Sequence, residues 1–490
     1  MIAVVLLLAC ASGGSPLVRG QPGDADTAPD TDTSGVDAST VPVSHPRELR
    51  GLYVATVYSI DWPSSATSGA ASQRAEITSI LDLASAARLN AVFLQVRPEG
   101  DALYASSIEP WSRWTSGTQG VDPGYDPLED WVREAHARGI EVHAWLNPYR
   151  ARVGSTATSG LAEGHMALAF PRHAHAYNGN LWMDPGSTEV RARVIAVVTD
   201  VVTRYDVDGV HIDDYFYPYP DDTEFPDAAT WDPYVAGGGT LSRDDWRRSN
   251  TAALVRDMAA AVRAHDPALR FGVAPFGIWR PGTPSGTTGL DAYGVLYADP
   301  LAWIAEGTVD YLAPQLYWET TNAGQEFGLL APWWDAQLAD GQDHFPALNL
   351  SAIGTDDFTL AEYAAELAIA RGLPRTRGQI WYSASPLIDD VAGLRATFPT
   401  WYSAPALPPT APGARDRAEP APTVTFADGV ASWVAREGRR AITVYRSEGD
   451  AWTLDRIVPA SAGAVTLGEG RWALASVGVG GVESAGVVVP

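Results

Sequence analysis

Residues 209–215 read Gly-Val-His-Ile-Asp-Asp-Tyr, an apolar stretch that ends in two acids and an aromatic residue. Successive side chains of a β-strand point to opposite faces. Val210 and Ile212 therefore share one face, which we expect to pack against helices. His211 and Asp213 share the other face, and Asp213 stands at the end of the strand. The pattern predicts a buried parallel strand with a carboxylate at its carboxyl end.

Seven more segments resemble this one, and helical patterns separate them. The strands are predicted at 49–57, 91–97, 141–147, 209–215, 270–276, 311–318, 345–353 and 379–385, and the main helices at 72–88, 127–138, 188–205, 243–265 and 360–371. Strands that alternate with helices predict a parallel sheet. Eight such repeats favour an α/β fold closed into a (β/α)8 TIM barrel over 46–401. No Gly-x-Gly-x-x-Gly follows the first strand, which argues against a dinucleotide-binding fold.

The C-terminal part of the chain has a different character. Residues 402–422 are rich in proline and predict a linker. Beyond them, 431–435, 441–446 and 471–477 alternate like half-buried strands. This pattern predicts a small fibronectin-III-like β-sandwich over 423–490, which carries no catalytic constellation and has an accessory role.

The N-terminal residues predict export. Residues 1–10 end in Leu-Leu-Ala-Cys and resemble the lipobox of bacterial lipoproteins, in which the cysteine carries lipid after cleavage. This apolar run is too short to span a bilayer. Cys10 is also the one cysteine, so no intrachain disulfide forms. Residues 11–45 lack an apolar period and predict a flexible tether. We expect a lipid-anchored envelope protein, periplasmic or at the cell surface, with an ordinary signal peptide as the alternative.

Composition narrows the class of ligand. The 490 residues carry a net charge of −25 and no lysine, so the clustered cations that nucleic acid requires are lacking. The chain holds 18 Trp, 19 Tyr and 11 Phe, enough for a large core and for a surface that stacks on flat ligand faces. We expect no nucleic-acid partner and no cofactor. The absence of long heptads favours a monomer.

Polar and aromatic side chains gather where the predicted strands end. In a parallel barrel these ends meet at one mouth, which holds the active site. Strand alternation predicts that the following residues face the barrel interior: Phe93, Gln95, Arg97, His143, Trp145, Asn147, Gln315, Tyr317 and Glu319. A core would not tolerate so many polar groups, because each unpaired one costs about 1–3 kcal/mol. We predict that the following residues bind the ligand: Gln95, Arg97, His143, Trp145, Asn147, Tyr149, Arg150, His211, Tyr215, Tyr217, Gln315, Tyr317 and Trp318.

Two acids at an aromatic mouth are what cleavage of a glycosidic bond requires. One carboxylic acid protonates the leaving oxygen, and the other carboxylate attacks the anomeric carbon or activates water. Asp213 is the predicted nucleophile or base. Glu319 is the predicted proton donor, because its apolar neighbours at 317–318 would raise its pKa. Asp214 and Asp101 are the rival donors.

Structural roles compete with these assignments. Asp213 could instead form an ion pair with Arg97, and Glu319 could be a salt-bridge partner at the rim. A carboxylate separation of about 5 Å would mean retention of configuration and one of about 6.5–9.5 Å inversion. Spacing along a chain does not encode that distance.

Several blocks of this sequence are similar to the glycosyl-hydrolase-like 10 family. They are 47–57 (RELRGLYVATV), 61–63 (DWP), 95–98 (QVRP), 100–104 (GDALY), 145–150 (WLNPYR), 208–215 (DGVHIDDY), 272–277 (GVAPFG) and 310–318 (DYLAPQLYW). The resemblance covers 46–400. It implies a TIM barrel and an exported bacterial enzyme that cleaves carbohydrate, with peptidoglycan strands, including strands stripped of peptides, as the suggested substrate. It also places Asp213 where related barrel glycosidases carry a nucleophile.

Two other classes of function fit part of the pattern. A non-catalytic glycan-binding envelope protein would have the same barrel and the same aromatic mouth. A metal-dependent hydrolase would need ligands such as His143, His211 and Asp213 to converge. Because no His-x-x-x-His or similar spacing is present, we predict no metal site.

Overall fold

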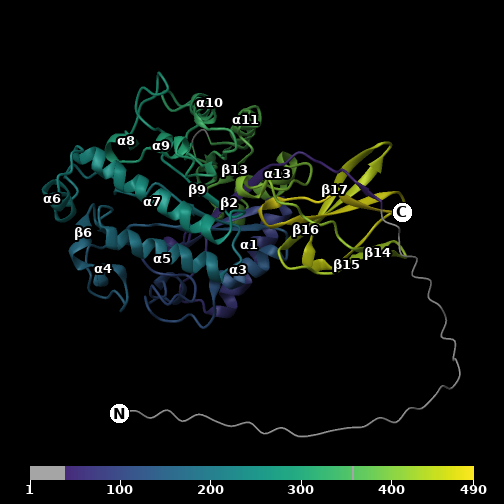
Figure 1. The fold of residues 1–490 in the computed structure, drawn as a ribbon, viewed down its shortest axis with the longest axis horizontal. Helices are drawn as coiled ribbons and strands as arrows, with labels where there is room; N and C mark the ends of the chain where they lie inside the picture. The colour runs from purple at the N-terminus through teal and green to yellow at the C-terminus, as the bar shows by residue number, and fades with distance from the viewer. Residues whose placement is uncertain (1–38, 356–357) are drawn as a thin grey trace, which may run out of the picture. The chain divides into compact units, whose positions relative to one another are not determined.

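The computed structural model describes residues 39–355 and 358–490. Its largest sheet is parallel and runs in the order β11-β10-β9-β8-β4-β3-β2-β13-β12. Figure 1 labels β2, β9 and β13 of this sheet. The strands are β2 (Leu49–Val54), β3 (Ala91–Arg97), β4 (Glu141–Leu146), β8 (Gly209–Ile212), β9 (Arg270–Val273), β10 (Tyr311–Leu312), β11 (Asp343–His344), β12 (Ala347–Leu348) and β13 (Gly378–Trp381). Each of the eight predicted segments contributes to this sheet.

The sheet closes on itself through the segment that holds β11 and β12. β11 pairs with β10 and β12 pairs with β13, while β13 pairs with β2. Only Phe345 and Pro346 separate β11 from β12, and a proline interrupts the ladder because it has no N–H to donate. Counted as one interrupted strand, this segment gives the eight strands of a TIM barrel, as predicted.

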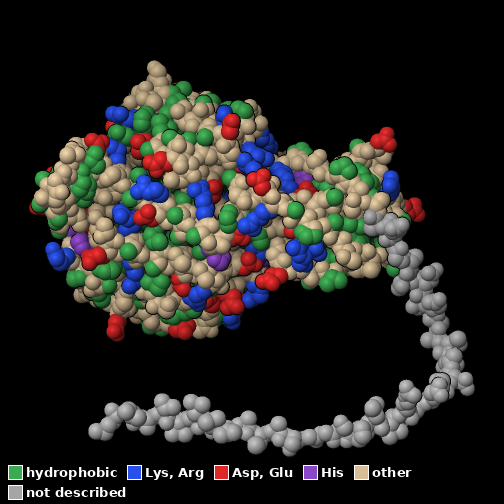
Figure 2. Space-filling view, in the orientation of Figure 1, with side chains coloured by type: hydrophobic (Ala, Val, Ile, Leu, Met, Phe, Trp, Pro, Cys, Tyr) green, Lys and Arg blue, Asp and Glu red, His purple; other side chains and the backbone are tan. Residues whose placement is uncertain are grey.

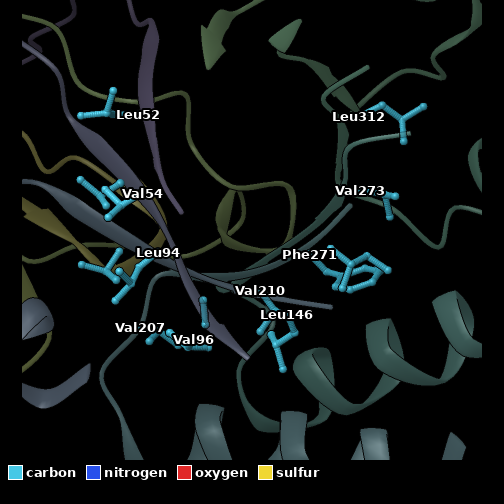
Figure 3. Close-up of a cluster of buried hydrophobic side chains, with 14 of the residues drawn as sticks. Leu52, Val54, Leu94, Val96, Leu146, Val207, Val210, Phe271, Val273 and Leu312 are labelled. Carbon is cyan, nitrogen blue, oxygen red and sulfur yellow. The ribbon is translucent and has the colours of Figure 1, made fainter. Parts of the chain in front are cut away.

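Alternation along the strands divides apolar side chains into two layers. Val210 and Ile212 are fully buried in the layer between strands and helices. Figure 3 shows part of this layer, with labelled side chains from β2, β3, β4, β8, β9 and β10. The second layer fills the barrel interior and includes Tyr53, Phe93 and Tyr311. The predicted inward and outward faces of β4 and β8 are confirmed, and so are those of β3 except at Arg97, which a bulge turns away.

The five predicted helices are present. They are α1 (Ala70–Ala86), α3 (Pro127–His136), α5 (Thr188–Arg204), α7 (Arg243–His265) and α11 (Leu360–Arg371). Their starts follow capping chemistry: the Ser242 side chain accepts from the N–H of Asp245 at the start of α7. α5 and α7 lie side by side against the barrel (Figure 1). Within 39–355 and 358–490, no helix is both long and apolar enough to cross a membrane.

Further helices and a small sheet lie in the loops between the barrel elements. The remaining α-helices are α2 (Arg113–Ser116), α4 (Met166–Ala169), α6 (Ala228–Ala236), α8 (Ala292–Val295), α9 (Pro300–Ala305), α10 (Phe327–Gln337), α12 (Ser385–Ile388) and α13 (Leu394–Trp401). A three-stranded antiparallel sheet lies between β4 and α5 and consists of β5 (Arg150–Arg152), β6 (Ala174–Tyr177) and β7 (Asn180–Met183). This sheet follows the strand end that carries Asn147.

The C-terminal residues, together with β1 from before the barrel, form two antiparallel sheets, as a small sandwich requires. One has the order β1-β20-β19-β16-β17 and the other β14-β15-β18. The strands are β1 (Thr40–Val41), β14 (Val424–Ala427), β15 (Val430–Trp433), β16 (Arg439–Glu448), β17 (Ala451–Pro459), β18 (Ala464–Thr466), β19 (Trp472–Gly478) and β20 (Gly486–Val489). Trp433, Val444 and Trp472 form the core between them. The fibronectin-III likeness stays a prediction.

Two predicted boundaries need correction. The tether predicted over 11–45 does not extend to 45, because β1 pairs with β20. The linker predicted over 402–422 is packed: Ala411 and Ala414 are fully buried, and the N–H of Ala411 donates to Gly480. Proline content indicated extended chain and could not reveal this packing. Cys10 and most of the predicted tether lie outside the described residues.

Charged side chains of both signs are interspersed on the face shown in Figure 2. The acidic excess of the chain is therefore not gathered there into one patch. A surface that mixes both signs favours solubility, and net charge by itself says little about the fold.

Candidate active site

A cavity of about 360 Å³ opens where the barrel strands end. This is the end at which TIM barrels place their chemistry. The lining residues are Tyr53, Val57, Tyr58, Ile60, Gln95, Trp145, Arg150, Asp213, Asp214, Tyr215, Ala274, Gln315, Tyr317 and Tyr382. Eight of them are among the predicted site residues: Gln95, Trp145, Arg150, Asp213, Asp214, Tyr215, Gln315 and Tyr317.

Asp213 is held by the side chain of Asn147. The Asn147 amide nitrogen donates to both carboxyl oxygens of Asp213, at 2.7 Å each. The Asn147 carbonyl oxygen accepts from Gln95 at 2.6 Å and from Arg150 at 2.7 Å. Because two donors occupy that oxygen, the amide group must turn its nitrogen toward Asp213. Asn147 was predicted to bind the ligand. It does not line the cavity, and it contacts the lining residue Asp213 instead.

Gln95 and Arg150 are themselves oriented by the backbone. The Gln95 carbonyl oxygen accepts the N–H groups of Thr56 and Val57, at 2.9 Å each, so its amide nitrogen is free to donate to Asn147. The Arg150 side chain donates to the carbonyl of Pro98 at 3.0 Å. Side chains fixed in this way keep a preorganised site in place.

The two neighbouring acids are buried together. Asp213 is 5% exposed and Asp214 is 2% exposed. Burial raises the pKa of Asp213 to about 7, and the charge of Asp214 adds to the rise, whereas Arg150 opposes it. Burial also raises the pKa of Asp214, and hydrogen bonding by Tyr219 opposes that rise. Two close carboxyls in a low-dielectric site resist double ionisation, so near neutral pH the pair holds a proton.

Aromatic rings form much of the cavity wall. The ring of Tyr53 lies 5.3 Å from that of Trp145 and 5.8 Å from that of Tyr382, centre to centre. Tyr317 stacks on Tyr382 at 5.6 Å. At the lip, Tyr58 is 57% exposed. Such rings stack on the apolar faces of sugars while their polar edges reach hydroxyl groups.

His211 and His143 do not line the cavity, although both were predicted to bind ligand. His211 lies deeper in the barrel, bonded to the hydroxyls of Tyr53 at 2.8 Å and Tyr311 at 2.9 Å. Burial holds its pKa well below the usual value, so it is neutral there. His143 stacks on Phe93 at 4.5 Å. Both side chains point inward as predicted. Because each lies in the middle of its strand, it points into the packed barrel interior and not into the cavity at the mouth.

Arg97 points away from the cavity. Its guanidinium forms a fully buried, two-pronged ion pair with Glu109, at 2.6 and 2.7 Å. The ladder between β3 and β4 shifts between Gln95 and Arg97, and a β-bulge of this kind re-aims the side chain that follows it. Arg97 still donates to the carbonyl of Asn147 at 2.5 Å. It therefore supports the site through the backbone, and it does not pair with Asp213.

Glu319 and Asp101 also lie away from the cavity. β10 ends at Leu312, so the strand alternation that aimed Glu319 inward does not reach it. Glu319 is half-buried and accepts from Asn322 at 3.0 Å. Asp101 accepts from Gln119 at 3.2 Å, and burial together with the charge of Glu99 raises its pKa to about 7. Of the three candidate proton donors, Asp214 is the one that reaches the cavity.

Three predicted aromatic residues belong to the packing around the site. Tyr149 is fully buried in the layer between strands and helices. Tyr217 packs edge-on against Phe225 at 5.5 Å, and Trp318 against Phe276 at 5.6 Å. Their positions in loops after the strands gave no indication of which way they would turn. None of the three lines the cavity.

Six lining residues were not predicted: Tyr53, Val57, Tyr58, Ile60, Ala274 and Tyr382. Tyr53 and Tyr382 follow the alternation rule, because Leu52 and Trp381 face the helices. The same reasoning applied to 49–57 and 379–385 would have found them. In the part of the chain that the structure describes, no group of three or more His, Cys, Asp or Glu side chains is placed to hold a metal ion.

The closed βα barrel with an acid pair at its fourth strand and an aromatic cavity defines a glycoside-hydrolase-like protein. The family model "Glycosyl hydrolase-like 10" matches residues 48–345, and the chain belongs to this family. It is 37% identical over 392 residues to "Glycosyl hydrolase YngK" of Bacillus subtilis (strain 168), covering 77% of this chain and 76% of that protein. It is 38% identical over 317 residues to "Glycosyl hydrolase DigH" of Escherichia coli (strain K12), covering 61% and 71%.

One solved structure that resembles this chain does so distantly. An α-L-fucosidase isoenzyme 2 from Paenibacillus thiaminolyticus has a TM-score of 0.46 and 14% identity, over 73% of this chain and 49% of that one. Similarity at that level carries no inference about substrate.

Proposed function

We propose that this protein hydrolyses glycosidic bonds in the glycan strands of the bacterial envelope, with peptidoglycan, intact or stripped of its peptides, as substrate. The observation that carries the proposal is the pair Asp213 and Asp214, buried together in the wall of an aromatic cavity with raised pKa values. Paired carboxyls with different environments are the means by which glycosidases supply an acid and an anion at once.

The surroundings of the two acids suggest their roles. Asp213 has a pKa raised to about 7, so it keeps a proton near neutral pH and can give it to the leaving oxygen. Asp214 accepts a hydrogen bond from the hydroxyl of Tyr219, a bond that favours the ionised form of the carboxyl group. We therefore assign the proton donor to Asp213 and the anion to Asp214. This reverses the role that strand position alone suggested for Asp213.

The cavity suits a sugar. Its volume of about 360 Å³ falls in the range of about 300–1,000 Å³ that is usual for ligand pockets. Tyr317 and Tyr382 offer stacked ring faces, while Gln315 and Arg150 place polar groups in the same wall. The names of the two relatives, both called glycosyl hydrolases, agree with this class of reaction.

The test is release of sugar fragments from purified peptidoglycan, with and without prior removal of the peptides by an amidase. Wild type would be compared with Asp213→Asn, Asp214→Asn and the control Glu319→Gln. We expect release by wild type and by the control, and none by the two aspartate variants. Full release by Asp213→Asn would refute the assignment. No release from either substrate by wild type, with glycan still bound, would favour the non-catalytic binding protein.

The place of action is proposed from the sequence motif. Residues 7–10 (Leu-Leu-Ala-Cys) suggest lipid attachment at Cys10 after export to the envelope. The expected result is incorporation of labelled palmitate by wild type and loss of the label in Cys10→Ser. A labelled Cys10→Ser variant would contradict the anchor.

A further inference from the structure

The cavity offers an acid pair from one strand end. Asp213 and Asp214 are consecutive residues after β8, and they are the two carboxyl-bearing residues among those that the described chain contributes to the lining. A two-carboxylate mechanism places the acid and the nucleophile or base on opposite sides of the scissile bond, about 5–9.5 Å apart. In this lining, no acid from another strand end completes such an arrangement.

The other side chains of the lining are poor nucleophiles. The rest of the lining consists of aromatic, amide, aliphatic and arginine side chains. Tyrosine can attack an anomeric carbon only as a phenolate. Burial raises the pKa of Tyr53 and Tyr317 well above the usual value and that of Tyr382 to about 12. These phenols stay protonated at any pH at which the enzyme would work.

Asp214 is better placed to orient a group than to attack. It is 2% exposed and accepts a hydrogen bond from Tyr219. A carboxylate that is buried and already bonded is a weak nucleophile, because attack would break that bond and move the group out of its site. Gln315, another residue of the lining, also lowers the pKa of Asp214 through a side-chain hydrogen bond. An N–H of the substrate would bind the carboxylate beside Gln315 or in its place.

We propose that the substrate supplies the nucleophile: the carbonyl oxygen of a 2-acetamido group on the sugar whose bond is cleaved. This inference rests on the proposed function and specifies its substrate class as glycans that carry an N-acetylated amino sugar at the cleaved position. Asp214 orients the acetamido N–H, and Asp213 protonates the leaving oxygen.

The bonds and protons balance. The acetamido oxygen forms a bond to the anomeric carbon while the bond from that carbon to the leaving oxygen breaks, and the leaving oxygen takes the proton of Asp213. The resulting cyclic cation shares its N–H proton with Asp214. Water then attacks the anomeric carbon, gives one proton to Asp213 and reopens the ring. The product keeps the anomeric configuration, because two inversions occur at the same carbon.

The wall of the cavity has the shape and chemistry for an acetyl group. The ring centre of Tyr53 lies 5.3 Å from that of Trp145 and 5.8 Å from that of Tyr382. Ala274 contributes a small methyl side chain to the same lining. A methyl group fits against such rings. The indole N–H of Trp145 is buried and makes no well-formed hydrogen bond within the described residues, but it lies near Asp213, whose pKa it helps to lower. When Asp213 is protonated, a carbonyl oxygen of the ligand offers this N–H a better acceptor than the neutral carboxyl group does.

The first test compares two forms of one substrate: peptide-free glycan strands of peptidoglycan, and the same strands after chemical removal of the N-acetyl groups. We expect wild type to cleave the acetylated strands and to lose at least about 100-fold in kcat/KM on the deacetylated ones. Equal rates on both would overturn the inference and leave the proposed function intact. No cleavage of either form would instead refute the proposed function.

The second test follows the intermediate. A thiazoline analogue of the cyclised sugar should inhibit competitively, and early products observed by NMR should keep the anomeric configuration. Inversion, or a mass increase of the protein with a 2-deoxy-2-fluoro glycoside, would overturn the inference, because both require a different nucleophile. Trp145→Phe keeps the ring and removes the N–H. It should lower kcat on acetylated strands, whereas Trp114→Phe, outside the cavity lining, should not.

Discussion

The side-chain amide nitrogen of Asn147 donates to both carboxyl oxygens of Asp213, at 2.7 Å each. This relationship follows from strand register. β4 and β8 pair Trp145 with His211 and Leu146 with Ile212, so the next residues of the two strands stand opposite each other. The proton affinity of Asp213 is thus set partly by a residue of the neighbouring strand.

Removing this amide should move the pH profile. Asn147 lowers the pKa of Asp213, so Asn147→Ala should raise that pKa further. If Asp213 must be protonated, the basic limb of kcat/KM against pH shifts to higher pH. Asp213 becomes charged as it gives up its proton, and loss of hydrogen bonds to that charge, each worth about 1.5–3 kcal/mol, should also lower kcat roughly 10- to 100-fold. A shift of the acidic limb instead would show that Asp213 works in its ionised form.

The two candidate partners of Asp213 can be separated by substitution. Asp214 lines the cavity, whereas Glu319 bonds Asn322 outside it. Asp214→Asn should lower kcat/KM by at least about 1,000-fold, since loss of a catalytic group costs several kcal/mol. Glu319→Gln should stay within about threefold of wild type. Comparable losses of kcat/KM in both variants, measured on the same glycan strands, would show that Glu319 takes part in catalysis.

Much of this fold could be predicted from the sequence. The strands are apolar on one face with a period of two, and the helices between them have recognisable caps, so local pattern and global fold agree. Barrel closure followed from the number of repeats. The packing of 402–422 was missed because it depends on partners distant in the chain: Ala411 donates to Gly480, and composition does not record such a contact.

Site residues were predicted correctly within regular strands, where side chains alternate between two faces. They were misplaced after a bulge or beyond a strand end, where this alternation is lost. Asp213, Gln95 and Trp145 were located by alternation alone. Arg97 follows a bulge that only the paired ladder reveals. Glu319 lies seven residues beyond the end of β10, where no period remains. Alternation shows which side chains face inward but not how far along the strand, toward the mouth, each one lies. For this reason His211 was predicted at the mouth, although it lies in the barrel interior.

Breaking the buried ion pair between Arg97 and Glu109 should unfold the protein more easily. Both side chains are completely buried, so Arg97→Met leaves a charge without its partner, at a cost of about 3–5 kcal/mol in the free energy of unfolding. Urea denaturation would measure it. The double variant Arg97→Met/Glu109→Leu removes both charges and should recover part of the loss. A double variant no more stable than the single one would show that packing, and not the unpaired charge, dominates.

Replacing Asp213 should stabilise the protein in a pH-dependent way. The folded pKa of Asp213 is raised from 3.8 to about 7, so between these values the native state binds more protons than the unfolded state does. Stability is therefore lost as pH rises through this window. This difference between the folded and unfolded pKa of Asp213 corresponds to at most about 4 kcal/mol in the free energy of unfolding. Asp213→Asn has no such titration.

The measurement is the thermal midpoint of wild type and Asp213→Asn from pH 4 to pH 8. The two should agree near pH 4, where Asp213 is neutral like asparagine, and the variant should unfold several degrees higher at pH 8. Asp232→Asn, at an exposed position of α6, is the matched control and should show no growing difference. A variant that is less stable than wild type at pH 8 would mean that the ionised carboxylate, held by Asn147, stabilises the fold instead of straining it. A gain in stability together with loss of activity would place Asp213 among the groups that a site retains for its chemistry at the expense of its stability.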